Sequence, residues 1–324
     1  MRLPTFDDVA AASERLTGVA VHTPLIESSA LNARVGARIL IKPENLQRMG
    51  AFKFRGAYNA ISRLDREKWP GGVATCSSGN HAGGVAEAAR LCGIAATIVM
   101  PEDAPENKLA RTRAAGAEII TYDRQKEDRE AIAAEISKDR GACYISPYDH
   151  PDIIAGQGTA GLELMRQARA LGAQPDCLIA PCGGGGLIAG LALAVRHLSP
   201  GIEVYAVEPE GFDDHARSLA SGRREKNAAL SGSICDALLA PMPGELTFQI
   251  NAKALSGALS VSDDEARDAI RFAFNELKLV LEPGGAVALA ALLNGRMATK
   301  DRTIALILSG GNIDGDQFAG ILAA

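Results

Sequence analysis

The chain has 324 residues, of which 47% are hydrophobic and 23% are charged, and its formal net charge is −5. This length suggests about two domains with a large buried core. The acidic balance, without any block of like charges, argues against a nucleic-acid-binding or polybasic membrane surface, so we expect a small-molecule ligand and neither a membrane nor a nucleic-acid partner.

The first predicted element is an amphipathic helix near the N-terminus. Thr5 and Asp8 have the spacing of a capping box, and Gly18 is expected to end the helix. This stretch has no apolar signal core, and the 6 cysteines form no C-x-x-C pair, so neither an export signal, a disulfide framework nor a zinc site is indicated. We therefore expect a cytoplasmic protein with reduced thiols.

From about residue 37, short apolar runs alternate with helical stretches. The runs read RILIK, GVATC, ATIVM, AEIITY, CLIAP, EVYAVEP and TIALIL. Pro105 and a capping box at Ser262 mark helix starts, and Gly93, Gly116 and Gly172 mark helix ends. The alternation predicts an α/β protein made of βαβ units with parallel sheets.

The chain order predicts two domains. Residues 70–148 form the smaller one, and residues 1–69 and 149–324 form a larger, discontinuous one, with SPYDHPDIIAGQGT as the returning loop. Its first part, SPYDHPD with His150, is expected to be an exposed connection, and a place at the mouth between the domains is the alternative. The uncharged stretch from Cys177 to Val195 is long enough for a membrane span. Pro181 and four consecutive glycines instead predict a short strand, a tight loop and a helix there.

Loops that follow parallel strands are where ligands bind in α/β folds. The loop SSGNHAGG follows GVATC and opens a helix, so its N–H groups, with Ser78, Asn80 and His81, predict a site for a carboxylate; a merely capped helix start is the alternative. The loop SGGN follows TIALIL, and its Ser309 can hydrogen-bond a ligand heteroatom or cap the next helix.

A run of four glycines, Gly183 to Gly186, follows CLIAP. Bare backbone amides at a helix start can wrap a phosphate closely, although a packing turn is also possible. Gly184, Gly186 and Ala189 also fit a weak dinucleotide-binding fingerprint, which leaves a Rossmann-type nucleotide-binding protein as an alternative.

The segment EPEGFDD follows EVYAV and carries two acids around a turn. Glu208 and Asp214, with a turn carbonyl, have the donors that a hard cation prefers, whereas an isolated pair of acids is more often solvated surface.

Lys53 lies between two phenylalanines in GAFKFRGA. Phe52 and Phe54 are expected to desolvate the ammonium, and the following helix start disfavours positive charge, so both predict a lowered pKa and a nucleophilic amine. An amine, a phosphate loop and a carboxylate site together indicate pyridoxal phosphate holding an amino acid.

Five motifs occur in the order found in the fold-type II pyridoxal-phosphate enzymes: GAFKFRGA, SSGNHA, CGGGGL, LEPGGAVALAA and SGGN. Over nearly its whole length the sequence resembles the serine/threonine dehydratase and serine racemase branch. The resemblance implies two parallel-sheet domains similar to those of the tryptophan synthase β subunit, and a homodimer. Ala51 and Gly83 depart from the family pattern, which often has serine and glutamine there.

The resemblance also implies roles for the motif residues. Lys53 would bind the cofactor covalently, Phe52 would pack near its ring, and Asn80 would hydrogen-bond its phenolic oxygen. The phosphate would be bound by Gly183, Gly184, Gly185 and Gly186, and Ser309 would face the pyridine nitrogen.

The substrate and metal sites are implied in the same way. The substrate carboxylate would be held by Ser78, Gly79, Asn80 and His81. Ser78 would also be the catalytic residue opposite Lys53. A magnesium or other divalent ion would be held by Glu208, Asp214 and the carbonyl of Phe212.

The predicted function is that of a pyridoxal-phosphate-dependent ammonia-lyase. Lys53 would remove the α-proton of L-serine, L-threonine or a 3-hydroxyaspartate, the β-hydroxyl would leave, and a 2-oxo acid and ammonia would form. The alternatives are an amino-acid racemase that uses Lys53 and Ser78 as opposed bases, a β-replacement synthase, and the nucleotide-binding protein.

Overall fold

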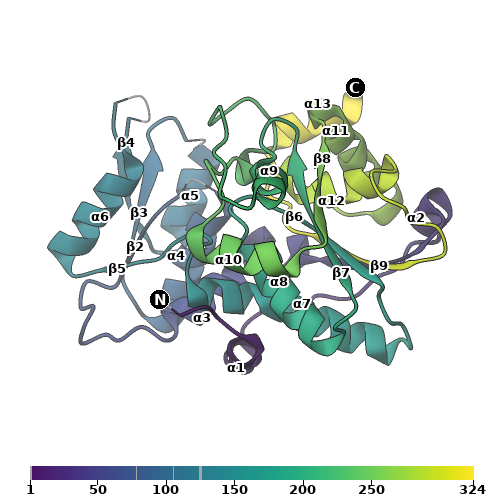
Figure 1. The fold of residues 1–324 in the computed structure, drawn as a ribbon. Helices are drawn as coiled ribbons and strands as arrows, with labels where there is room; N and C mark the ends of the chain where they lie inside the picture. Colours follow the sequence, from purple (N-terminus) through teal and green to yellow (C-terminus); the bar gives the residue numbers. More distant parts are fainter. Residues whose placement is uncertain (1, 78, 105, 124–125) are drawn as a thin grey trace.

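Two parallel β-sheets organise the protein (Figure 1), as a computed structural model describes it over residues 2–77, 79–104, 106–123 and 126–324. The five-stranded sheet has the order β1-β9-β6-β7-β8, and the four-stranded sheet has the order β4-β3-β2-β5. All paired strands are parallel. The predicted α/β class with two parallel sheets is therefore confirmed.

The strands match the predicted apolar runs with two additions. The larger sheet contains β1 (Arg38–Pro43), β6 (Cys177–Pro181), β7 (Glu203–Pro209), β8 (Gly257–Val261) and β9 (Thr303–Leu308). The smaller sheet contains β2 (Val73–Cys76), β3 (Ala96–Pro101), β4 (Glu118–Tyr122) and β5 (Cys143–Tyr144). The additions are β5 and β8. The smaller sheet falls within residues 70–148, while the domain boundaries themselves stay a prediction.

Thirteen α-helices connect and cover the strands within the described ranges. They are α1 (Phe6–Leu16), α2 (Ser29–Val35), α3 (Lys53–Ile61), α4 (Asn80–Cys92), α5 (Glu106–Ala114), α6 (Arg129–Arg140), α7 (Pro151–Ala170), α8 (Gly186–Leu198), α9 (Asp214–Ser221), α10 (Glu245–Ala254), α11 (Asp263–Phe272), α12 (Pro283–Leu293) and α13 (Gly315–Ala323).

Helix ends follow the predicted signals. Capping boxes at Thr5 and Ser262 begin α1 and α11. Gly93, Gly116 and Gly172 have the positive φ angles of 62°, 83° and 64° expected just beyond helix ends. Pro105 lies outside the described residues.

The prediction of a loop over SPYDHPDIIAGQGT is wrong from residue 151 onward, because α7 begins there with His150 as its N-cap. The preceding residues 146–150 are half-buried rather than exposed. The glycines that suggested a loop instead permit close helix packing. A Cβ on Gly156 would lie 2.6 Å from the carbonyl oxygen of Arg55 in α3, and one on Gly158 would lie 2.6 Å from that of Gly190 in α8. Helix α7 is therefore the buried partner of both α3 and α8.

The uncharged stretch from Cys177 to Val195 contains β6, the glycine loop and most of α8, as the sequence predicts. Its side chains pack with those of β7 and β9 in one apolar cluster. Among the helices of the described ranges, none combines the length and apolar composition that crossing a bilayer requires.

A buried ionic network fixes α3 against the larger sheet. The guanidinium of Arg55 is fully buried and donates to Glu44 at 2.7 and 2.8 Å and to Glu163 at 2.7 and 2.9 Å. Lys42, also fully buried, donates to Glu163 at 2.9 Å. Burial opposes the charge of Arg55, but Glu44 and Glu163 outweigh it and raise the pKa of the guanidinium.

Candidate active site

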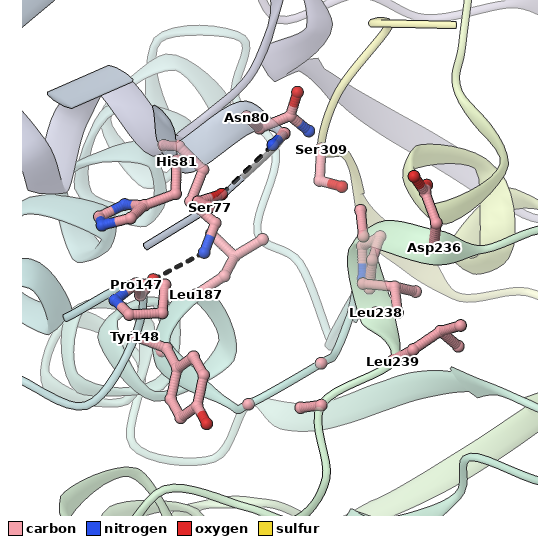
Figure 2. Close-up of a pocket in the computed structure, with 18 of the residues that line it drawn as sticks. Ser77, Asn80, His81, Pro147, Tyr148, Leu187, Asp236, Leu238, Leu239 and Ser309 are labelled. Carbon is pink, nitrogen blue, oxygen red and sulfur yellow. Dashed lines mark hydrogen bonds between the residues drawn. The ribbon is translucent and has the colours of Figure 1, made fainter. Parts of the chain in front are cut away.

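A cavity of about 270 Å³ collects residues from both sheets and their connecting loops. Most of the site residues predicted from the sequence line it: Phe52, Lys53, Gly79, Asn80, His81, Gly183, Gly184, Gly185, Gly186 and Ser309. Figure 2 shows Asn80 and Ser309 at one end of this cavity and Tyr148 at the other. Ser78 lies outside the described residues.

The amine of Lys53 enters this cavity from the first residue of α3. Its Nζ donates a hydrogen bond of 2.6 Å to the carbonyl oxygen of Pro147, and it lies 5.3 Å from the centre of the Phe52 ring. Burial lowers the pKa of Lys53 to about 8, although the charge of Glu282 acts in the opposite direction. The predicted lowering of this pKa is therefore confirmed. Phe54, which was expected to desolvate the amine together with Phe52, instead packs in the core beside Tyr58.

The segment before α3 is tied to the end of β9. Ala51 and Gly310 form an antiparallel bridge, Phe52 N donates to Ser309 O at 3.1 Å, and Gly311 N donates to Gly50 O at 2.9 Å. These bonds hold Lys53 and the hydroxyl of Ser309 at the same cavity, although 256 positions separate them in the chain (309 minus 53).

The start of α4 brings a second set of donors to the cavity. The first N–H groups of a helix have no partner within it, so those at Asn80 and His81 can meet an anion. The Asn80 side chain donates to Glu282 Oε1 at 2.6 Å and accepts from Asn312 at 2.7 Å. This fixes the orientation of its amide.

His81 is neutral in this setting. Burial and the nearby charge of Lys53 lower the pKa of the imidazole to about 3. The Nε2 atom lies 3.1 Å from Ile145 O, which can only accept, so the proton is assigned to Nε2. The buried Nδ1 is then an acceptor, and it has no partner among the described residues.

The glycine loop turns its carbonyls away into the protein. Gly184 O accepts from Gly244 N at 3.2 Å and from Thr247 Oγ1 at 2.7 Å. A Cβ on Gly184 would lie 2.5 Å from the ring of Tyr148, and one on Gly185, whose φ is +92°, would lie 2.5 Å from His215 Nε2. Only glycine fits both positions, which leaves the loop amides and the start of α8 for an anion.

A comparison with known families indicates which cofactor belongs to this fold. The family described as pyridoxal-phosphate dependent enzyme matches residues 16–310. The chain belongs to this family.

Relatives of this pyridoxal-phosphate-dependent enzyme cover its full length. The serine racemase of Schizosaccharomyces pombe is 44% identical over 99% of this chain and 98% of its own length. The L-threo-3-hydroxyaspartate ammonia-lyase of Pseudomonas sp is 44% identical over 99% of both chains. The structure of maize serine racemase superimposes with a TM-score of 0.92 at 36% identity, covering 99% of this chain and 98% of that chain.

The residues of the cavity fit pyridoxal phosphate. The cofactor needs a nucleophilic amine, an anion site for its phosphate and a polar group for its ring nitrogen. Lys53 Nζ has a lowered pKa, the loop at the start of α8 presents free amides, and Ser309 lines the same cavity. The five motifs therefore converge on one site.

The predicted metal ligands lie behind the glycine loop rather than in the cavity. Glu208 accepts from His215 N at 2.9 Å and from Ala216 N at 3.0 Å, at the start of α9. Asp214 accepts from Asn227 at 2.7 Å through Oδ1, while its buried Oδ2 has no hydrogen-bond partner among the described residues. Burial, and then the charge of Glu208, raise the pKa of Asp214 to about 7.

These two acids fit a divalent cation. Both are essentially fully buried, and no lysine or arginine in the described ranges forms a salt bridge with either one. A bound cation would supply the missing positive charge, and Phe212, at the turn between them, has a backbone carbonyl that could serve as a further ligand.

The sequence reasoning missed several residues that line the cavity. Among them are Met49, Arg129, Tyr148, Asp236, Leu238, Glu282 and Asn312. Glu282 lies within the motif LEPGGAVALAA, so the motif contained a signal that could have found it. Tyr148 lies in SPYDHPD, where the ring packs on Gly184, and no local pattern predicts that contact.

Proposed function

We propose that this enzyme is an ammonia-lyase that eliminates water from a small β-hydroxy amino acid, after which hydrolysis of the product gives ammonia and a 2-oxo acid. The observation that carries this proposal is the amine of Lys53, which has a pKa of about 8 and lies in one cavity with the glycine loop and the start of α4. When bound, pyridoxal phosphate supplies an electron sink for negative charge at the α-carbon of the amino acid.

Lys53 is proposed to hold the cofactor and then to act as the base. A lysine with a pKa near 8 is partly unprotonated at neutral pH, so its Nζ can accept the α-proton of the substrate. The carbonyl of Pro147, 2.6 Å from Nζ, orients the amine. Phe52 lies beside Nζ and is proposed to pack on the cofactor ring.

The start of α4 is proposed to bind the substrate carboxylate. The backbone N–H groups at Gly79, Asn80 and His81 would supply the donors, and the one at Gly79 would exchange its 3.3 Å hydrogen bond to Ser77 Oγ for the carboxylate. The ring N–H of His81 is already donated to Ile145 O. Asn80 is also proposed to reach the phenolic oxygen of the cofactor. Ser78 keeps its predicted roles in substrate binding and as the second base.

Two further groups are proposed to complete the cofactor site. The amides of Gly183 to Gly186 would bind the phosphate, and Ser309 would face the ring nitrogen. Beside a neutral hydroxyl the ring nitrogen would stay unprotonated, so the ring would withdraw less electron density than it would beside a carboxylate, which suits rapid loss of the β-hydroxyl. Glu208, Asp214 and the carbonyl of Phe212 would hold a divalent cation.

A homodimer in the cytoplasm is part of the same proposal. The resemblance to the dehydratase and racemase branch supports the dimer. None of the six cysteines is in a disulfide, which is typical of a reducing compartment.

A substrate panel tests the proposed reaction. We expect the holoenzyme to release equal amounts of ammonia and a 2-oxo acid from at least one of L-serine, L-threonine and L-threo-3-hydroxyaspartate. Arg129 lines the cavity, and its cation can pair with the second carboxylate of hydroxyaspartate. Formation of the D-amino acid without 2-oxo acid would favour the racemase alternative. No reaction of any kind with the panel would contradict both.

The pH dependence of cofactor binding gives a second test. Below about pH 8 Lys53 is mostly protonated and cannot attack the cofactor aldehyde, so the rate of covalent recombination of the apoenzyme with pyridoxal phosphate should rise about tenfold per pH unit up to that value and then level off. Stopped-flow absorbance measures this rate. A rate that keeps rising to about pH 10, the ordinary lysine pKa, would show that burial does not shift Lys53.

A further inference from the structure

A thiol and an imidazole lie beside the two buried carboxylates. Cys182, Glu208 and His215 each place a ligand atom within 4.8 Å of the others, and all three are buried. His215 Nδ1 is 3.5 Å from Glu208 Oε1 and 3.7 Å from Asp214 Oδ2. The residues come from the end of β6, the end of β7 and the start of α9, so no local spacing in the sequence brings them together.

Two atoms of this cluster lack partners. Asp214 Oδ2 and His215 Nδ1 are buried without a hydrogen bond to any described residue, and the two residues are 1% and 0% exposed. A buried polar atom left unsatisfied destabilises the folded protein. Because the two atoms lie 3.7 Å apart, one cation placed between them would satisfy both.

We propose that this cluster binds Zn²⁺ in preference to Mg²⁺, through the three residues whose ligand atoms lie within 4.8 Å of one another: Cys182 Sγ, His215 Nδ1 and a carboxylate oxygen of Glu208. Asp214 Oδ2, 3.7 Å from His215 Nδ1, is the neighbouring negative charge. Magnesium takes oxygen ligands almost exclusively, whereas thiolate and imidazole select zinc. The inference goes beyond the proposed reaction and does not rest on it, because its readout is the bound metal.

The separations measured from His215 Nδ1 suit an ion shared with its neighbours. Two donors that are each about 2.1 Å from zinc lie about 3.4 Å apart. The separations of His215 Nδ1 from Glu208 and Asp214, 3.5 and 3.7 Å, are close to this value. Cys182 Sγ donates a weak hydrogen bond of 3.5 Å to Gly183 O. Rotation of the Cys182 side chain would replace this hydrogen bond with a bond to the metal. On binding, the thiol releases its proton to solvent and the thiolate bonds to zinc.

Asn251 can support the imidazole from the other side. Its Nδ2 lies 3.1 Å from His215 Nε2, and its buried Oδ1 has no partner among the described residues. With zinc on Nδ1, neutral His215 carries its proton on Nε2 and needs an acceptor. A half-turn of the Asn251 amide places Oδ1 there, at the loss of a hydrogen bond of 3.4 Å from Nδ2 to Gly185 O.

Metal competition and X-ray absorption test the proposal. The holoenzyme is dialysed against Zn²⁺ with Mg²⁺ in large excess, and the bound metals are measured by mass spectrometry. We expect one zinc ion per chain and, at the zinc absorption edge, one sulfur scatterer at about 2.3 Å with lighter atoms at about 2.0–2.1 Å. Zinc displaced by magnesium, or zinc bound without sulfur, would overturn the proposal.

Two cysteine variants assign the sulfur. Cys182→Ser is nearly isosteric and should lose the sulfur scatterer and weaken zinc binding by more than about 100-fold, since even outer partners of a metal site change affinity by about 10–100-fold. The control variant Cys177→Ser changes a buried cysteine at the start of β6, the strand that precedes Cys182, and should retain both the sulfur scatterer and the zinc affinity. A sulfur signal that persists in Cys182→Ser would contradict the assignment. The sulfur signal is measured first on the unmodified enzyme, so the proposal is tested even if Cys182→Ser does not fold.

Discussion

Replacing Lys53 with alanine is expected to lower the rate of 2-oxo acid formation by at least about 10³-fold, because the proposed covalent attachment and the base that removes the α-proton are lost together. The measurement is the initial rate with saturating substrate, at a pyridoxal phosphate concentration that saturates the variant. The variant should also lose the absorbance that covalent attachment of the cofactor gives.

Two controls make this result specific. Lys253→Ala changes an exposed lysine in α10 and should leave the rate unchanged. Borohydride reduction of the unmodified enzyme, followed by peptide mapping, should place the cofactor on Lys53. If the Lys53→Ala enzyme kept full turnover, or if the reduced cofactor were found on another lysine, the proposed role of Lys53 would be wrong.

Replacing Arg55 with alanine is expected to destabilise the protein by about 3–5 kcal/mol, because the carboxylates of Glu44 and Glu163 then stay in the interior without the guanidinium between them. Urea denaturation of the apoenzyme measures the loss. The bound cofactor would otherwise add its own stabilisation to the folded state.

Matched variants separate burial from charge pairing. Arg38 pairs with Glu27 at 2.7 Å on the surface, and Arg38→Ala should have little effect on stability. The double variant Arg55→Ala with Glu44→Gln should lose less than the two single variants combined, since it removes one unpaired charge. If Arg38→Ala and Arg55→Ala lowered the stability equally, the buried network would contribute no more to stability than an exposed ion pair does.

Most of the fold could be predicted from the sequence because the parallel strands are buried on both faces. Such strands are continuous apolar runs, as in TIALIL and CLIAP, and their bounds could be placed to within a residue or two. Strand β5 has two residues and strand β8 reads GALSV, so neither forms an apolar run. Helix α7 was missed in part because its glycines serve packing rather than turns.

The parts of the candidate site that lie within short motifs could be predicted from the sequence. Lys53, the glycine loop and Ser309 each follow a strand or begin a helix, and parallel sheets bring such positions together. Contacts that form only in three dimensions were not predictable. Tyr148 packs on Gly184, and His215 packs on Gly185, from segments distant in the chain.

The edge position of β1 in the larger sheet has a consequence for how the chain folds during synthesis. Its residues pair from Arg38↔Thr303 to Pro43↔Leu308, so the first strand to be made and the last one are direct neighbours only in the finished protein. The smaller sheet, by contrast, lies within residues 73–144 and can form as soon as that stretch leaves the ribosome. Strand β1 can therefore pair with β9 only after residues 303–308 have been made, and Ser309, which follows β9 and lines the cavity, reaches the site at that stage.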